Sequence, residues 1–76
     1  MPHIYLVMSE DIKLLPVTEE LVRLEAISVH GMLWLQTHFH DDEWDAIVQG
    51  VVLLDYDSAD KLSQDADMAG LRVIYN

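Results

Sequence analysis

The hydrophobic pattern is clearest at the two ends of the chain and ambiguous in the middle. Residues Ile4 to Met8 are apolar and partly β-branched, which predicts a buried strand. A mixed stretch follows and ends at Pro16. From Thr18 two patterns compete. Thr18 with two acids after it is typical of a helix start. Residues 22–26 nevertheless alternate with a period of two, as a strand does. The pattern leaves both structures open for residues 18–26.

Residues 28–39 also fit two periods. As a helix they place Val29, Met32, Leu33, Gln36 and Phe39 on one nearly apolar stripe. As a strand they place Ile27, Val29, Leu33, Leu35 and Phe39 on one face. Methionine, leucine and glutamine favour helices, so we expect a helix whose stripe faces the core.

The remaining elements have stronger signals. Residues 41–49 form a predicted short helix, with acids in its first turn, a buried face of Trp44, Ile47 and Val48, and a stop at Gly50. Residues 51–54 and 71–75 are predicted strands. Between them a helix over 58–69 is expected, capped by Asp57 or Ser58 and stopped by Gly70; its buried face is Ala59, Leu62, Ala66 and Ala69. A β-α-β unit of this kind predicts parallel strands.

These elements predict one α+β domain over residues 1–76. The strands at 4–8, 51–54 and 71–75 would form a small three-stranded sheet, with the helices packed on one face. The chain has 76 residues, which leaves no room for a second domain.

Composition narrows the classes of partner. Fourteen acids against four lysines and arginines give a formal net charge of -10. Such a charge repels nucleic acid and anionic membranes and attracts basic protein surfaces. The chain has no cysteine, which excludes disulfides and thiolate metal sites and favours the cytoplasm. Neither a signal peptide nor a membrane span is expected from the hydropathy pattern. The high apolar content of such a small domain also allows a homodimer, in which a second copy covers apolar surface.

The acids concentrate in the C-terminal half. Residues 38–76 hold nine acids against Lys61 and Arg72, a net -7, and residues 1–37 hold five against two, a net -3. A row of carboxylates on a rigid scaffold can imitate phosphates and occupy a basic nucleic-acid groove. The predicted partner-binding residues are Asp41, Asp42, Glu43, Asp45, Asp57, Asp60, Asp65, Asp67 and, as an interface anchor, Trp34.

The predicted function is therefore that of a non-enzymatic, acidic protein-binding module. Its most concrete form is a small inhibitor that covers the basic nucleic-acid-binding surface of a larger complex. Phage and mobile-element proteins that block restriction or CRISPR complexes are similar in composition: small, poor in cysteine and acidic. The alternative in which the acids only keep the protein in solution stays open. So does an accessory or oligomerising subunit that uses apolar surface.

The string Thr37-His38-Phe39-His40-Asp41-Asp42-Glu43 resembles the T-H-x-H-x-D-H zinc motif of the metallo-β-lactamase superfamily. The resemblance implies zinc ligands at His38, His40 and Asp42, and a hydrolase. It covers seven residues and departs at Glu43, where the motif has histidine, and no histidine follows residue 40. We retain one alternative, a metal site formed by His38, His40 and Asp42, with His30 as a further candidate ligand. This site requires a strand, because a helix would turn His38 and His40 about 200° apart. No glycine-rich cofactor loop and no nucleophile–base pair occurs, so we expect neither a cofactor nor an enzyme.

Overall fold

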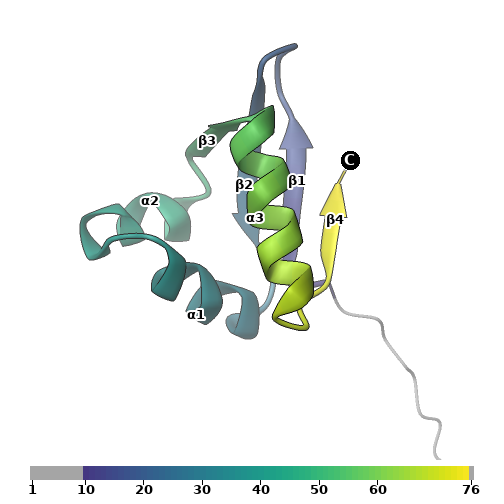
Figure 1. Ribbon diagram of the computed structural model, residues 1–76. Coiled ribbons are helices and arrows are strands. Elements are labelled where there is room, and N and C mark those ends of the chain that lie inside the picture. The colour runs from purple at the N-terminus through teal and green to yellow at the C-terminus, as the bar shows by residue number, and fades with distance from the viewer. Residues whose placement is uncertain (1–9, 76) are drawn as a thin grey trace, which may run out of the picture.

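The computed structural model describes residues 10–75, which fold into a four-stranded mixed sheet with three α-helices and one 3-10 turn (Figure 1). The predicted α+β class is confirmed. The predicted number of strands is wrong, because the sheet has four. In chain order the elements are β1 (Ile12–Pro16), β2 (Leu21–Ala26), α1 (Val29–His38), η1 (Asp41–Glu43), α2 (Trp44–Gln49), β3 (Val52–Asp55), α3 (Tyr56–Met68) and β4 (Val73–Tyr75).

The strand order is β3-β2-β1-β4, with the β1–β2 hairpin at the centre. Both β2–β1 and β2–β3 are antiparallel, whereas β1 and β4 are parallel. The strands of the predicted β-α-β unit, β3 and β4, therefore run in the same direction, as expected. They are not neighbours, however, because they form the two outer edges of the sheet. The predicted strand at 4–8 lies outside the described residues.

The hairpin resolves the ambiguity of residues 18–26 in favour of the strand. Thr18 does not start a helix: its hydroxyl accepts hydrogen bonds from the backbone N–H groups of Glu20 and Leu21, at 3.1 and 2.9 Å, and so closes the turn. The alternating pattern then places Val22 and Leu24 opposite Pro16 and Leu14. The first strand was not predicted, since Pro16 and the mixed residues before it carry no clear period.

All three helices cover the same face of the sheet, as predicted (Figure 1). On that face Ile12, Leu14, Val22 and Leu24 are at most 1% exposed and pack against Leu35, Ile47 and Leu62 of the helices. The opposite face carries alternate residues of the same strands, among them Lys13, Leu15, Arg23, Glu25, Leu53 and Ile74. No helix of residues 10–75 packs on this second face.

Helix α1 confirms the predicted helix over 28–39 and part of its predicted buried face. Met32 and Phe39 are partly buried against the core, as expected, whereas Val29 and Leu33 are 76% and 57% exposed. The fully buried residues of the helix are Gly31 and Leu35. The cause is a close approach of two backbones. A Cβ on Gly31 would lie 2.1 Å from the carbonyl oxygen of Asp11, so only glycine lets α1 approach the start of β1.

Asp11 connects three elements at this point. Its carboxylate accepts from the Ser28 hydroxyl at 2.5 Å and from the Arg72 N–H at 3.0 Å. Its carbonyl accepts from the Ile27 N–H at 2.9 Å. Ser28 in turn caps α1 by accepting from the Gly31 N–H at 2.9 Å. The hydrogen bond from Ser28, then that from Arg72, lowers the pKa of Asp11.

The predicted helix over 41–49 is confirmed as η1 followed by α2, and Gly50 ends it with a left-handed φ of 70°. Ile47 is buried as predicted. The predictions for Val48 and Trp44 are wrong, because these residues are 62% and 38% exposed. The indole N–H of Trp44 donates to the carbonyl groups of Gln36 and Phe39, at 3.0 and 3.4 Å, and so caps the last turn of α1.

Helix α3 starts two residues earlier than predicted, and its cap is Asp55 rather than Asp57 or Ser58. The Asp55 carboxylate accepts from the Ser58 N–H at 2.7 Å. Ala59, Leu62 and Ala66 form the buried face, as expected, whereas Ala69 is exposed. Within the described residues, no helix is long and apolar enough to cross a membrane.

Candidate functional site

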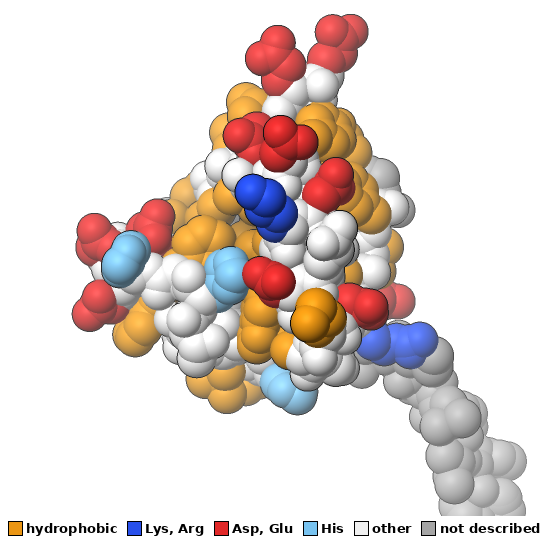
Figure 2. Space-filling view, viewed as in Figure 1, with side chains coloured by type: hydrophobic (Ala, Val, Ile, Leu, Met, Phe, Trp, Pro, Cys, Tyr) orange, Lys and Arg blue, Asp and Glu red, His pale blue; other side chains and the backbone are white. Residues whose placement is uncertain are grey.

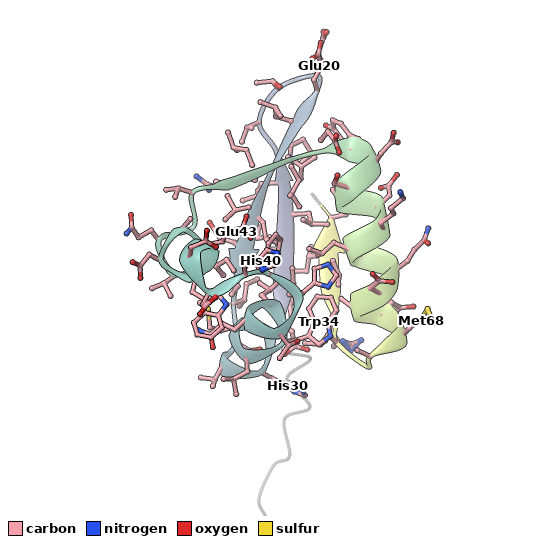
Figure 3. All side chains as sticks on the ribbon, turned by 60° about the vertical axis from the view of Figure 1, so that its left-hand side comes forward. Glu20, His30, Trp34, His40, Glu43 and Met68 are labelled. Carbon is pink, nitrogen blue, oxygen red and sulfur yellow. The ribbon has the colours of Figure 1, made fainter. Side chains whose placement is uncertain are left out.

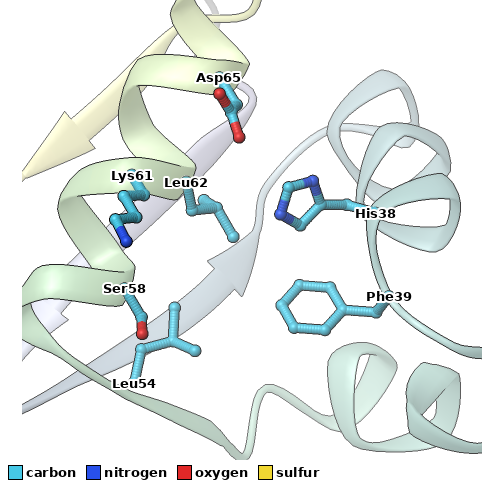
Figure 4. Close-up of a pocket in the computed structure, with 7 residues that line it drawn as sticks. All are labelled: His38, Phe39, Leu54, Ser58, Lys61, Leu62 and Asp65. Carbon is cyan, nitrogen blue, oxygen red and sulfur yellow. The ribbon is translucent and has the colours of Figure 1, made fainter.

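A groove of about 350 Å³ lies between the end of α1 and one side of α3 (Figure 4). Its apolar residues come from three elements: Phe39 follows α1, Leu54 lies on β3 and Leu62 on α3. The polar residues are His38, Ser58, Lys61 and Asp65. Figure 4 shows the two rings of His38 and Phe39 directed across the groove towards Leu62 and Leu54.

The α3 wall follows from helical spacing. Residues 58, 61, 62 and 65 are related as i, i+3, i+4 and i+7, so they lie along one side of the helix over two turns. Leu62, only 3% exposed, anchors the middle of this side in the core. Lys61 and Asp65 place one charge of each sign beside it, and both side chains are exposed.

The opposite wall is held by aromatic contacts at the end of α1. The His38 ring stacks on Trp34, with centroids 4.9 Å apart and planes at 23°. It also meets the edge of Phe39 at 5.5 Å. Trp34, labelled in Figure 3, is partly buried against the core. Its ring therefore supports the stacked ring of His38. This placement makes Trp34 a support of the groove wall, and its role as an interface anchor stays a prediction.

The groove lies in acidic surroundings. Asp65 borders it directly, and Asp55 and Asp57 stand at the start of α3. Hydrogen bonds from Ser58 lower the pKa of Asp55, and Lys61 lowers it further by its charge. Within residues 10–75, no carboxylate lies within 4.0 Å of the Lys61 ammonium. Figure 2 shows exposed hydrophobic surface with acidic side chains on both sides of it.

The structure separates the predicted acids of α3 into two groups. At 100° per residue, Asp60 and Asp67 lie about 20° apart on the helix, whereas Asp65 lies about 140° from Asp60. Asp60 faces β4: burial, followed by the charge of Asp60, raises the pKa of Tyr75. Asp65 instead faces α1 across the groove. The four residues Asp57, Asp60, Asp65 and Asp67 are thus all exposed but do not form one patch.

The second predicted group, Asp41, Asp42, Glu43 and Asp45, lies on η1 and the first turn of α2, and all four are exposed. Glu43 has a structural role as well, since its carboxylate accepts from the His40 N–H at 3.2 Å. In the sequence these acids begin two residues after Phe39. Within residues 10–75, the lining of the groove includes none of the four.

The metal alternative required His38 and His40 on one strand. Instead, His38 ends α1 and His40 precedes η1, on opposite sides of Phe39. Residues 10–75 contain no group of three or more histidines and carboxylates placed to hold a metal ion. The geometry of the described chain thus gives no support to a site at His38, His40 and Asp42.

Sequence reasoning missed most of the groove. Leu54, Ser58, Lys61 and Leu62 were not predicted as site residues, although the spacing of the last three on α3 was visible in the sequence. Phe39 was assigned to a core stripe. The contact between the end of α1 and α3 depends on the side of α1 that faces the sheet. That side is set by Gly31, whose role no local pattern reveals.

The fold and the groove define a class: a small acidic α+β domain with helices on one face of a mixed sheet. The chain belongs to the cyanobacterial NIF11-like domain family, whose sequence model matches residues 13–75. The match extends through every element from the second residue of β1 to the end of β4. Comparison with curated proteins and with solved structures returned no match.

Proposed function

We propose that this domain is a non-enzymatic protein-binding module whose partner presents a basic surface. The observation that carries the proposal is the exposure of its acids: eleven of the fourteen carboxylates belong to exposed residues. Among these eleven, Glu43 and Asp55 have structural partners, since they accept hydrogen bonds from the backbone N–H groups of His40 and Ser58. Burying so many unpaired charges against a neutral surface is costly, whereas a basic surface compensates them.

The narrower form of this proposal is an inhibitor that occupies the nucleic-acid-binding surface of a larger complex. Rigid helices support the idea, because α3 and η1–α2 hold their acids at fixed positions on the scaffold (Figure 2). Acids held in this way act at long range and speed encounter with a cationic surface. The absence of cysteine fits a reducing compartment, and we place the interaction in the cytoplasm.

The test is a pull-down with the purified protein as bait, washed at rising salt and read by mass spectrometry. A partner held by charge leaves as salt rises, because exposed ion pairs are screened. The double variant Asp60→Lys and Asp67→Lys should retain the fold and lose most of the captured partner. Gln64→Lys, on the outward side of the same helix, adds a positive charge without removing a carboxylate and is the control. Unchanged capture by the double variant would refute the proposal.

The inhibitor form makes a further demand, namely that the captured complex loses nucleic-acid binding in proportion to the added protein. A labelled oligonucleotide and the captured complex, titrated with the domain, measure this directly. If the domain binds the complex while the oligonucleotide stays bound, the broader proposal of a binding module stands and the inhibitor form does not.

A second function, an accessory or oligomerising subunit, is favoured by one observation. The outer side of α1 exposes Val29 and Leu33, and α1 contains no Asp, Glu, Lys or Arg. Such a surface is the part of this acidic chain on which two copies would repel each other least. Analytical ultracentrifugation of the wild type and of Leu33→Glu distinguishes the two functions. A dimer that the variant converts to monomer supports self-association, and a monomeric wild type excludes it.

A further inference from the structure

We propose that the groove between α1 and α3 is the docking site for the basic partner, and that it accepts an apolar side chain from a basic amphipathic segment. This inference rests on the proposed function. It adds the place of contact and the chemistry of the contacting segment. The groove combines the two requirements of such a segment: apolar residues in its interior and acidic residues beside it.

The shape of the groove supports an inserted apolar side chain. Leu54, Leu62 and Phe39 give the groove an apolar lining, and about 350 Å³ of space lies above them (Figure 4). The polar atoms of Ser58, Lys61 and Asp65 stand along one side of it. An amphipathic helix that binds a groove places its anchors at i, i+3, i+4 and i+7. The α3 wall has the same spacing over two turns, about 10 Å, and so offers contacts at a matching interval.

Charge selects a basic segment over an acidic one. Asp65 borders the groove, and Asp55 and Asp57 stand at the start of α3, against the single Lys61. A lysine or arginine next to the inserted side chain would meet Asp65. Lys61 opposes such a segment. Lys61 and Asp65 should therefore have effects of opposite sign on the binding of a basic segment. The comparison of Asp65 with Asp67, on the opposite side of α3, separates docking in the groove from a general attraction to acids.

The experiment uses the full chain and a fluorescent synthetic peptide of about 15 residues, with leucines at helical spacing and lysines elsewhere. A peptide of the same composition in scrambled order is the second probe. Fluorescence anisotropy at constant salt gives the Kd of each. Asp65→Lys is compared with Asp67→Lys, which makes the same change of charge two residues away on the opposite side of α3. Lys61→Gln completes the set.

We expect Asp65→Lys to weaken binding of the amphipathic peptide by about tenfold, as loss of a direct charged contact does, and Asp67→Lys by about twofold. Lys61→Gln should tighten binding by about twofold to fivefold. The methyl and ring signals of Leu54, Leu62 and Phe39 should shift in NMR spectra when the peptide is added. Circular dichroism of each variant confirms that the fold is retained.

The results that would contradict these expectations distinguish a failure of the groove from a failure of the proposed function. Equal losses for Asp65→Lys and Asp67→Lys, or equal affinity for the scrambled peptide, would overturn the groove while leaving attraction to a basic partner intact. Tighter binding by Asp65→Lys would also overturn the groove. If the wild-type protein binds neither peptide at low salt, both the groove and the proposed function are wrong.

Discussion

Replacing Gly31 by alanine should destabilise the domain, although alanine normally favours a helix over glycine by about 0.8–1.0 kcal/mol. The added Cβ would lie 2.1 Å from the Asp11 carbonyl oxygen and 2.8 Å from its carbonyl carbon. Ordinary contact begins at 3.4 Å, so α1 and the start of β1 must separate by about 1.3 Å. Both partners in this contact are backbone atoms, and no flexible side chain can absorb the movement.

The magnitude follows from what the separation disturbs. Asp11 receives hydrogen bonds from Ser28 and Arg72 on its carboxylate and from Ile27 on its carbonyl. Each is worth about 1 kcal/mol, and overpacking adds about 1–3 kcal/mol. After the gain in helix propensity, the net loss is about 3–5 kcal/mol. A domain of this size has about 4–11 kcal/mol of stability in total. Its Tm should therefore fall by about 12–40 °C.

Thermal unfolding followed by circular dichroism, together with urea titration, measures this loss. Gly70→Ala is the matched control: nothing lies within 4 Å of its added Cβ, but its φ is 88°. Its cost is therefore that of the left-handed backbone alone, about 1–2 kcal/mol. A Gly31→Ala variant with the Tm of the wild type, or a higher one, would show that the close approach of α1 to Asp11 is wrong.

Three further predictions concern the supports of the same scaffold and the metal alternative. Asp11→Asn should reduce the free energy of unfolding at neutral pH and make it depend less on acid. The pKa of Asp11 in the folded state is lowered below 3.8, so its carboxylate stabilises the fold above pH 3.8, and this contribution is lost as the pH falls through the folded pKa. Urea unfolding between pH 2 and 7 measures the difference. Trp44→Phe removes the indole N–H that caps α1 and should lower the free energy of unfolding in urea by about 1 kcal/mol, with little change in the helix content measured by circular dichroism. An unchanged free energy of unfolding would contradict the cap. Zinc at micromolar concentration should release no binding heat in calorimetry, and heat that disappears in a His38→Ala variant would restore the metal site.

Elements with complete local signals were predicted closely. Helix α3 has an acidic N-terminus, a regular apolar face and Gly70 after it; its start and cap were assigned two or three residues too late, and Ala69 lies outside its buried face. Helix α1 shows where such signals end. Its valine and leucine stripe predicts burial, but the contact between Gly31 and Asp11 turns that stripe outward. Local periodicity cannot detect a contact between residues 20 positions apart.

The candidate site was predicted less well than the fold for a related reason. The acids were recognised individually, but their grouping depends on helix rotation and packing, which place Asp65 on the groove and Asp60 near β4. The apolar part of the groove comes from three elements that meet only in the folded chain. A sequence pattern can therefore supply the α3 wall, whereas the wall formed by His38 and Phe39 requires the tertiary structure.

The strand order has a consequence for how the domain folds. The central hairpin, β1 with β2, is closed by a four-residue turn, whereas each outer strand pairs with a residue far along the chain, as in the pairing of Ile12 with Val73. Contacts between neighbours in sequence form with little loss of chain entropy, and distant ones form slowly. We expect the hairpin to form first and to serve as the template on which β3, α3 and β4 close from both edges. Variants in the hairpin should then slow folding, whereas variants in β4 should mainly accelerate unfolding.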